Sequence, residues 1–275
     1  MLLSNYLEAN GQKIHYLHNF ERAASDAPVL LLLHGFLLDS TMFSPLMQAL
    51  GNEFRLVAFD ARALGKTQWD GKAFSLYDTV ADCIALMDAL QIEKAIISGM
   101  SQGGYAALRL ALRHPARVSG LVLMSTRSGA DEEPTKAAYR EVRDTWKNVG
   151  AVEPMLKGLM GAIIGAEDDP KIAPYWAQWF PIWQNYKGDN IFHGMNNLLE
   201  RDEITPLLGQ IQQPALVLHG KEDSGVPFQL GEQLHQDLPN SQGFILTEGA
   251  HACVLTHVES YVEPIRNFVR QFAKG

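Results

Sequence analysis

The sequence predicts an α/β fold in which a mostly parallel, doubly wound sheet carries an N-terminal antiparallel hairpin and an inserted helical cap. Three observations predict it. Short apolar runs alternate with helical patterns along most of the 275 residues, as a parallel sheet with helical crossovers requires. One apolar run passes through Gly-x-Ser-x-Gly directly into a helical pattern. The interval 126–213 interrupts the alternation and is too long for a loop without structure of its own.

The first element is a hairpin, because residues 6–9 and 13–16 alternate around Asn10-Gly11, the strongest short hairpin signal. Continuous apolar runs then predict the buried strands of the parallel sheet, at 29–33, 55–59, 94–98, 119–124, 215–219 and 243–247. Helical patterns lie at 78–90 and 103–113. An amphipathic stretch from Tyr261 to Phe272 predicts the closing helix.

Composition excludes several classes of protein. With 47% hydrophobic residues and a net charge of -8, the chain can bury a full core behind an acidic surface. No basic patch dominates, which disfavours nucleic acid binding. Cys83 and Cys253 predict neither a disulfide framework nor a metal site, and we expect reduced thiols in a cytoplasmic protein. The N-terminus lacks the pattern of a signal peptide and no apolar run approaches membrane-spanning length, so we expect no membrane contact.

A serine at a strand-to-helix junction is the first candidate catalytic residue. Ser101 lies in Gly-x-Ser-x-Gly between an apolar strand and a helical pattern, which is the context of a nucleophile elbow. Gly99 and Gly103 lie two residues on either side, where larger side chains would collide with neighbouring backbone. The hydroxyl of Ser101 is therefore expected at the C-terminal end of its strand. The alternative is a glycine-rich turn capped by serine.

Two later strand ends carry the expected partners of this serine. Asp223 follows the buried strand predicted at 215–219 and is the candidate acid, with Glu222 beside it as the alternative. His251 follows the last predicted strand and is the candidate base. The segment 34–36, the serine, the acid and the histidine occur in the chain order that this architecture requires. That order makes the combined signal strong.

With these motifs the chain resembles the α/β-hydrolases over nearly its whole length, and most of all the serine esterase and enol-lactonase branch with a helical cap. The resemblance is carried by His34-Gly35-Phe36 with Asp39 and Phe43, Phe59-Asp60-x-Arg62-x-x-Gly65, Gly99-Met100-Ser101-Gln102-Gly103-Gly104, and His114-Pro115-x-Arg117-Val118. These motifs are highly specific for the fold and weakly specific for substrate. In the second motif Ala63 replaces the usual glycine and Thr67 the usual serine, so we expect a less sharply bent loop.

The interval after the sixth strand is predicted to form the cap. Helical patterns such as 137–142 and 155–160 support this prediction. The predicted division is a core domain of 1–125 and 214–275 with a helical cap (lid) insertion of 126–213. Four residues of the cap are candidates for the substrate pocket: Trp176, Trp179, Trp183 and His193. The alternative for the rings is to hold the cap onto the core, and for the histidine a solvated or capping role.

The resemblance implies acyl transfer to water through an acyl-enzyme on Ser101. His251 would take the serine proton while Asp223 orients the imidazole. The backbone N–H groups of Phe36 and Gln102 would form the oxyanion hole. The expected substrate is a small-molecule carboxylic ester or lactone, with no cofactor and no metal. We expect a monomer or homodimer.

Three other functions stay open at this point. Carbon–carbon bond hydrolysis of a ring-cleavage product uses the same triad, although its oxyanion segment usually reads Gly-x-Gly-Pro-Gly, unlike residues 34–38. Cofactor-free perhydrolysis stays open as well, although related segments often carry proline where this chain has Leu37. A ligand-sensing signalling module that keeps the triad is the third. Gly65-Lys66-Thr67 is similar to the end of a phosphate-binding loop, but Asp60 stands where that motif needs its first glycine.

Overall fold

A hairpin opens the chain in the computed structural model, which describes residues 2–272. Strands β1 (Leu3–Ala9) and β2 (Gln12–His18) pair antiparallel. The two residues of the turn between them, Asn10 and Gly11, have positive φ angles of 49° and 72°. A type I′ turn needs this conformation at both positions, so the Asn-Gly pair predicts both the hairpin and the form of its turn.

Six strands complete the sheet and run parallel to one another. They are β3 (Val29–Leu33), β4 (Arg55–Phe59), β5 (Ala95–Met100), β6 (Val118–Met124), β7 (Ala215–Gly220) and β8 (Ser241–Thr247). The strand order is β1-β2-β4-β3-β5-β6-β7-β8. The predicted fold class is confirmed, and each of these six strands is present within two residues of its expected bounds.

The strand order reverses at β3, because the chain passes from β3 to β4 on one side and then to β5 on the other. In open α/β sheets the ligand crevice lies outside the carboxyl ends of the strands at such a reversal. The topology therefore predicts a site between the loops that follow β3 and β5. Every residue of these two strands is buried, so the loops rest on a rigid support.

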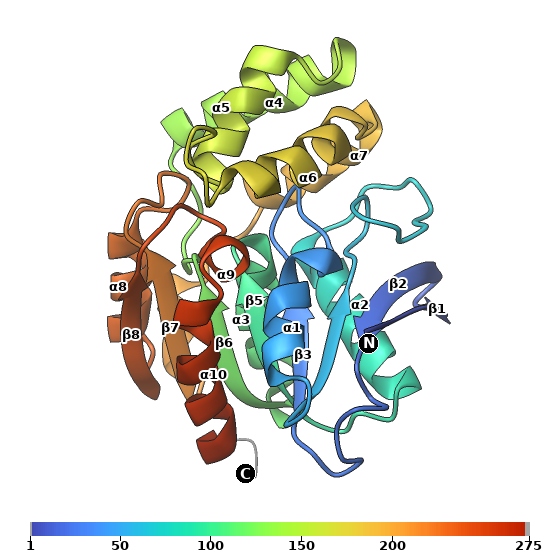
Figure 1. Cartoon of the computed structure of the whole chain (residues 1–275), viewed down its shortest axis with the longest axis vertical. Coiled ribbons are helices and arrows are strands. Elements are labelled where there is room, and N and C mark those ends of the chain that lie inside the picture. Colours follow the sequence, from blue (N-terminus) through green and yellow to red (C-terminus); the bar gives the residue numbers. More distant parts are fainter. Residues whose placement is uncertain (1, 273–275) are drawn as a thin grey trace.

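Helices cover both faces of the sheet (Figure 1). On one face lie α1 (Ser44–Leu50) and α10 (Glu259–Phe272), and on the other α2 (Leu76–Ala89) and α3 (Gln102–Arg113). Helix α8 (Phe228–Asp237) packs on β7 and β8, and the short α9 (Cys253–Thr256) precedes α10. Helix α10 buries Tyr261, Ile265, Phe268 and Val269, as its amphipathic pattern predicts.

Four further helices form the inserted cap. They are α4 (Glu133–Asn148), α5 (Glu153–Ile163), α6 (Ala173–Gln184) and α7 (Gly188–Leu199). They lie between β6 and β7 in the chain and above the end of the sheet where β3 and β5 finish (Figure 1). The division of the chain at residues 126 and 213 stays a prediction. Among residues 2–272, no helix has the length and hydropathy needed to cross a membrane.

The loop after β4 bends sharply although glycine is missing at one position. Ala63 has a φ of 68°, in the left-handed region that a residue with a Cβ adopts at some cost. The expectation of a less sharply bent loop is therefore wrong. The amide of Asn190 on α7 donates a hydrogen bond to the carbonyl oxygen of Ala63 at 2.8 Å, which ties the bend to the cap.

Asp60 holds the same loop from inside the protein. Its carboxylate accepts hydrogen bonds of 2.7 Å from the His15 ring and from the backbone N–H groups of Ser40 and Lys66. Burial alone would raise the pKa of Asp60. The bond from His15, nearby His34 and the two amides outweigh burial and hold the pKa at about 2.

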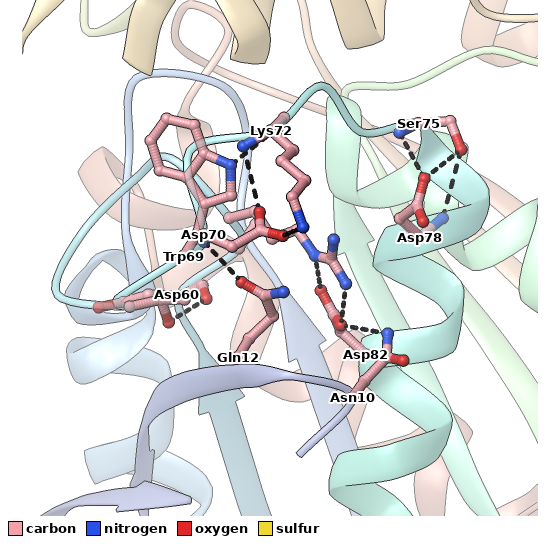
Figure 2. Close-up of polar contacts among 12 residues, drawn as sticks. Asn10, Gln12, Asp60, Trp69, Asp70, Lys72, Ser75, Asp78 and Asp82 are labelled. Carbon is pink, nitrogen blue, oxygen red and sulfur yellow. Dashed lines mark hydrogen bonds and ion pairs between the residues drawn. The ribbon is translucent and has the colours of Figure 1, made fainter. Parts of the chain in front are cut away.

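A second set of polar contacts joins this loop to the hairpin and to α2. The guanidinium of Arg62 donates two hydrogen bonds, of 2.7 and 2.8 Å, to the carboxylate of Asp82 on α2. Asn10 of the hairpin donates to the same carboxylate at 2.8 Å, and Gln12 accepts from the amide of Asp70 at 3.0 Å (Figure 2). The bidentate pair of Arg62 and Asp82 is shielded from water, so it is strong and well directed. The N-terminal hairpin is thus fixed to the core.

We expect Asp60→Asn to weaken the acid sensitivity of the fold. Because the folded-state pKa of about 2 lies below the unfolded value of about 4, the carboxylate stabilises the protein above pH ~4. That stabilisation is lost as the pH falls towards 2, and two pKa units correspond to about 2–3 kcal/mol. Denaturant unfolding between pH 2 and 5 should show a shallower pH dependence in the variant. The exposed Asp26→Asn is the control, and equal slopes in Asp60→Asn and wild type would contradict this reading.

Candidate active site

Ser101 lies in a turn so tight that only glycine fits at two positions beside it. Its φ and ψ are 52° and -117°, a combination that residues other than glycine rarely adopt. A Cβ on Gly99 would lie 2.3 Å from the carbonyl oxygen of Gly103. A Cβ on Gly103 would lie 2.0 Å from the carbonyl oxygen of Leu33. The turn between β5 and α3 therefore has the geometry that the motif predicts.

Backbone hydrogen bonds keep Ser101 in this conformation. Its N–H donates to the carbonyl oxygen of Met124 at 2.9 Å. Its own carbonyl oxygen accepts from the N–H groups of Gly104 and Tyr105, at 2.8 and 3.1 Å, and from the hydroxyl of Thr126 at 2.9 Å. Since strain persists only where the surroundings enforce it, these contacts over β5, α3 and β6 hold the serine in position.

His251 and Asp223 form a buried pair in the loops after β8 and β7. The Nδ1 of His251 donates to the Oδ2 of Asp223 at 2.7 Å. The backbone N–H groups of Gly225 and Val226 donate to Oδ1 at 3.0 and 2.8 Å. The Nε2 of His219 lies 3.1 Å from Oδ2. A carboxylate with this many donors is well oriented to hold one imidazole tautomer.

The electrostatics keep Asp223 ionised. Burial alone would raise its pKa. The imidazole of His251 and the hydrogen bonds from His219, His251 and the amide of Val226 outweigh burial and hold the pKa of Asp223 well below its usual range. An ionised carboxylate only accepts hydrogen bonds, so Nδ1 of His251 carries the proton. Its Nε2 is then free to accept one.

Two backbone amides near Ser101 are free to bind a ligand oxygen. Among residues 2–272, the N–H groups of Phe36 and Gln102 donate to no acceptor. Gln102 is the first residue of α3, whose positive end favours negative charge. A Cβ on Gly35 would lie 3.3 Å from the Cβ of Ser101, so the segment that carries Phe36 lies directly against the serine. Leu37 follows with a φ of 66°, which turns the chain there.

One cavity of about 190 Å³ contains both Ser101 and His251. It lies between the core and the cap, and most of its wall is apolar, as is usual for small-molecule sites. Its apolar residues are Phe36, Leu37, Leu159, Ala162, Ile163, Met195, Leu198 and Val226. Besides Ser101 and His251, its polar residues are Tyr105, Asp131, Tyr139, Arg201 and Ser224, and Gly225 completes the wall.

The four cap residues expected in the substrate pocket lie elsewhere, since none of them lines this cavity. Trp179 and Trp183 have no exposed surface, and Trp176 donates from its indole N–H to the carbonyl oxygen of Gly165 at 2.9 Å. His193 packs against the rings of Trp69 and Phe192. The three tryptophans share one buried face of α6, and α6 packs against α5. Their burial is consistent with the alternative that these rings hold the cap onto the core.

Several cavity residues were not identified from the sequence. Tyr105 had a usable signal, because it follows Ser101 by four positions and so lies on the same face of the predicted helix. Tyr139, Asp131 and Arg201 come from distant parts of the cap, and no local pattern connects them.

A second row of serine, histidine and aspartate connects the hairpin to the loop after β4. The hydroxyl of Ser4 is 2.8 Å from Nε2 of His15, whose Nδ1 donates to Asp60 at 2.7 Å. Ser4 is in an exposed, extended strand at the sheet edge, with neither an elbow nor a helix N-terminus beside it. The composition of a triad therefore does not by itself define a nucleophile here, and Ser4 provides a matched control for Ser101.

The fold and this arrangement agree with one known family of proteins. A family model described as the alpha/beta hydrolase fold matches residues 28–155, a stretch that includes β3, the elbow and the start of the cap. The sheet order and the helical cap agree with that match. The chain is similar to the α/β-hydrolases in sequence over residues 28–155 and in fold over nearly its whole length, and the resemblance predicted from its motifs is confirmed.

Several hydrolases are similar to this chain in sequence or in structure. RutD of Agrobacterium fabrum, named as a candidate carbamate hydrolase, is 29% identical over 261 residues, covering 90% of this chain and 95% of that protein. The mouse serine hydrolase BPHL is 27% identical over 266 residues, covering 95% and 84%. Among solved structures, the enol-lactonase of Burkholderia xenovorans matches with a TM-score of 0.87 at 20% identity, over 97% of this chain and 100% of that one. A thermophilic esterase of Thermogutta terrifontis matches with a TM-score of 0.86 at 24% identity, over 98% and 99%.

We expect Gly99→Ala to destabilise the protein severely, because the new Cβ would lie 2.3 Å from backbone oxygen and backbone cannot yield as a flexible side chain can. A loss of roughly 3 kcal/mol or more in the free energy of unfolding is expected. Gly158→Ala is the matched control: it is exposed in α5 with no atom within 4 Å of the added Cβ. It should stabilise the helix by up to about 1 kcal/mol. Denaturant unfolding of both variants checks this, and similar stabilities would contradict the tight turn.

Proposed function

We propose that this protein is a serine hydrolase that cleaves a carboxylic ester or lactone of a small molecule through an acyl-enzyme on Ser101. His251 is the general base, Asp223 orients it, and the amides of Phe36 and Gln102 form the oxyanion hole. The observation that carries the proposal is the 2.7 Å hydrogen bond from His251 to Asp223, next to a strained serine that lines the same cavity.

The proposed reaction has two halves. The hydroxyl of Ser101 attacks the carbonyl carbon while Nε2 of His251 takes its proton, and the carbonyl oxygen becomes an oxyanion. The two amides bind this oxyanion; losing one such donor costs a serine protease about 3 kcal/mol of transition-state stabilisation. His251 then gives the proton to the leaving alcohol. Water repeats the sequence on the acyl-enzyme and releases the acid.

The mostly apolar cavity and the relationship to hydrolases support a small organic substrate. Carbon–carbon bond hydrolysis, perhydrolysis and ligand sensing would use the same three side chains. Turnover of short-chain aryl esters separates these functions. An esterase releases the aryl alcohol continuously, whereas a sensor that is acylated once gives a single slow burst of about one equivalent.

Ser101→Ala should abolish ester hydrolysis, with kcat reduced on the order of a million-fold as for other serine nucleophiles. The melting temperature should change little, because only one small side-chain atom is removed. Ser4→Ala is the control, since Ser4 also has a histidine and an aspartate in line but should keep full activity. Release of 4-nitrophenol from its butanoate measures both. A loss of activity in Ser4→Ala alone would move the nucleophile to the hairpin.

Asp223→Asn should leave the protein folded and lower kcat by roughly ten-thousand-fold, the size of the effect in a serine protease. The cause is that an amide can stabilise the wrong tautomer of His251. Glu222→Gln is the control, because its side chain is exposed beside the loop, and it should retain wild-type turnover. Steady-state kinetics of both variants with one aryl ester test the assignment. Near-normal activity of Asp223→Asn would show that another group orients the base.

A further inference from the structure

A compact group of polar side chains forms part of the cavity wall, and the proposed reaction does not use it. Tyr105 lies on α3, one helical turn after the serine, and Tyr139 lies on α4. Asp131 precedes α4 and Arg201 follows α7. All four line the cavity that contains Ser101. This group, called the polar subsite below, interrupts a wall that is otherwise mostly apolar.

Arg201 and Asp131 already satisfy each other within the polar subsite. The side chain of Arg201 has no exposed surface, and its Nη1 donates to Oδ2 of Asp131 at 2.6 Å. Other guanidinium N–H groups donate to the carbonyl oxygens of Leu198 and Gly129. Its charge is therefore compensated inside the protein. Arg127 also contacts Asp131, and the carboxylate of Glu203 lies near Arg127. A carboxylate on a ligand would add a third negative charge to two cations that Asp131 and Glu203 already balance, which burial makes costly.

The two tyrosine hydroxyls, in contrast, are unused. Arg201 lies over the ring of Tyr105 at 4.4 Å from its centroid, and Tyr105 is 3% exposed. Among residues 2–272, neither the Tyr105 nor the Tyr139 hydroxyl makes a hydrogen bond. Neither hydroxyl oxygen is completely shielded, and both residues line the cavity, so both hydroxyls can be reached from it. A ligand oxygen that accepts from these hydroxyls would therefore be bound favourably.

Both hydroxyls stay protonated at neutral pH. Burial raises the pKa of Tyr105. Burial, the neighbouring Tyr105 and Asp131 raise the pKa of Tyr139 to about 12. The tyrosines thus present O–H donors, and the two oxygens of Asp131 are occupied by Arg201 and Arg127. The free groups of the polar subsite suit an uncharged acceptor such as a carbonyl oxygen.

We propose that the substrate carries an uncharged oxygen, such as a keto group, which accepts hydrogen bonds from Tyr105 and Tyr139 while Ser101 attacks the ester or lactone carbonyl. The proposal rests on the proposed hydrolase function and names its substrate class. Tyr105, Tyr139 and Ser101 line one cavity of about 190 Å³. Test substrates with four or five bonds between the keto group and the ester carbonyl are small enough to place both groups in this cavity.

The first test compares esters that differ only in the added oxygen. On the acyl side these are 4-nitrophenyl 5-oxohexanoate and hexanoate, and on the alcohol side 4-oxopentyl acetate and pentyl acetate. The wild type should show at least a tenfold higher kcat/KM for the keto ester in one of the two pairs, as a site built to hydrogen-bond its substrate does. Equal kcat/KM within both pairs would overturn the proposal.

Variants connect this preference to the tyrosines. Tyr139→Phe and Tyr105→Phe should each bring the ratio of keto to alkyl kcat/KM close to one. The cap residue Tyr175 does not line the cavity, and Tyr175→Phe should keep the wild-type ratio. A ratio that is unchanged in both subsite variants would overturn the proposal. The 4-nitrophenyl monoester of glutaric acid should react more slowly than the hexanoate, and a preference for this carboxylate would show that the subsite is anionic instead.

A binding measurement keeps this inference separate from the hydrolase assignment. Methyl 5-oxohexanoate and methyl hexanoate are added to Ser101→Ala, and the shift in unfolding temperature is followed with concentration. The keto ester should bind at least tenfold more tightly, and Tyr139→Phe in the same background should remove the difference. Equal binding would overturn the subsite even where the wild type hydrolyses esters. Selective binding without any Ser101-dependent turnover would instead reject the hydrolase function and keep the subsite.

Discussion

The contact between Gly103 and the carbonyl group of Leu33 sets the distances within the whole site. Because Gly103 has no Cβ, α3 begins against the end of β3. The free N–H group of Phe36, after β3, and that of Gln102, after β5, therefore come close to Ser101. The strain at Ser101 is shared by neighbouring loops. Leu37, Ala63 and Ser125 also have positive φ angles, and each follows the end of β3, β4 or β6. Such residues cost about 1–3 kcal/mol each, and the buried parallel strands beneath them offset that cost.

The core was predictable because its strands are continuous apolar runs. β3 and β4 begin and end at the predicted residues. Burial on both faces makes each strand a run of apolar residues, apart from Arg55 at the start of β4. Three helices of the core were not predicted. α1 has seven residues, α9 has four, and α8 is mostly polar, so none has a long apolar stripe. Short or polar helices are fixed by the strands they connect and not by their own sequence.

The candidate triad was predictable for a different reason, namely that its residues occur at strand ends in a fixed order. The cavity wall was not. Trp176, Trp179 and Trp183 mark one face of a helix, but periodicity does not tell whether that face meets a cavity or other helices. In the structure this face is buried and does not line the cavity. Tyr139 and Arg201 line the same cavity as Tyr105 of α3 only after the cap has folded onto the core, so this arrangement depends on tertiary structure alone.

The buried pair of Arg201 and Asp131 also joins the two segments that connect the cap to the core. The two residues are 70 positions apart in sequence. Beside it, the hydroxyls of Ser128 and Thr205 lie 2.8 Å apart, and Glu203 accepts from the amide of Ala130 at 3.0 Å. The segment that precedes α4 and the segment that follows α7 are therefore bonded to each other, and together they form the neck between core and cap. Lengthening or exchanging the outer cap helices would leave this neck unchanged. It would also leave unchanged the distance between β6 and β7, the core strands on either side of the insertion. Cap sequences can thus diverge to admit new substrates without disturbing the loops that hold Ser101, Asp223 and His251.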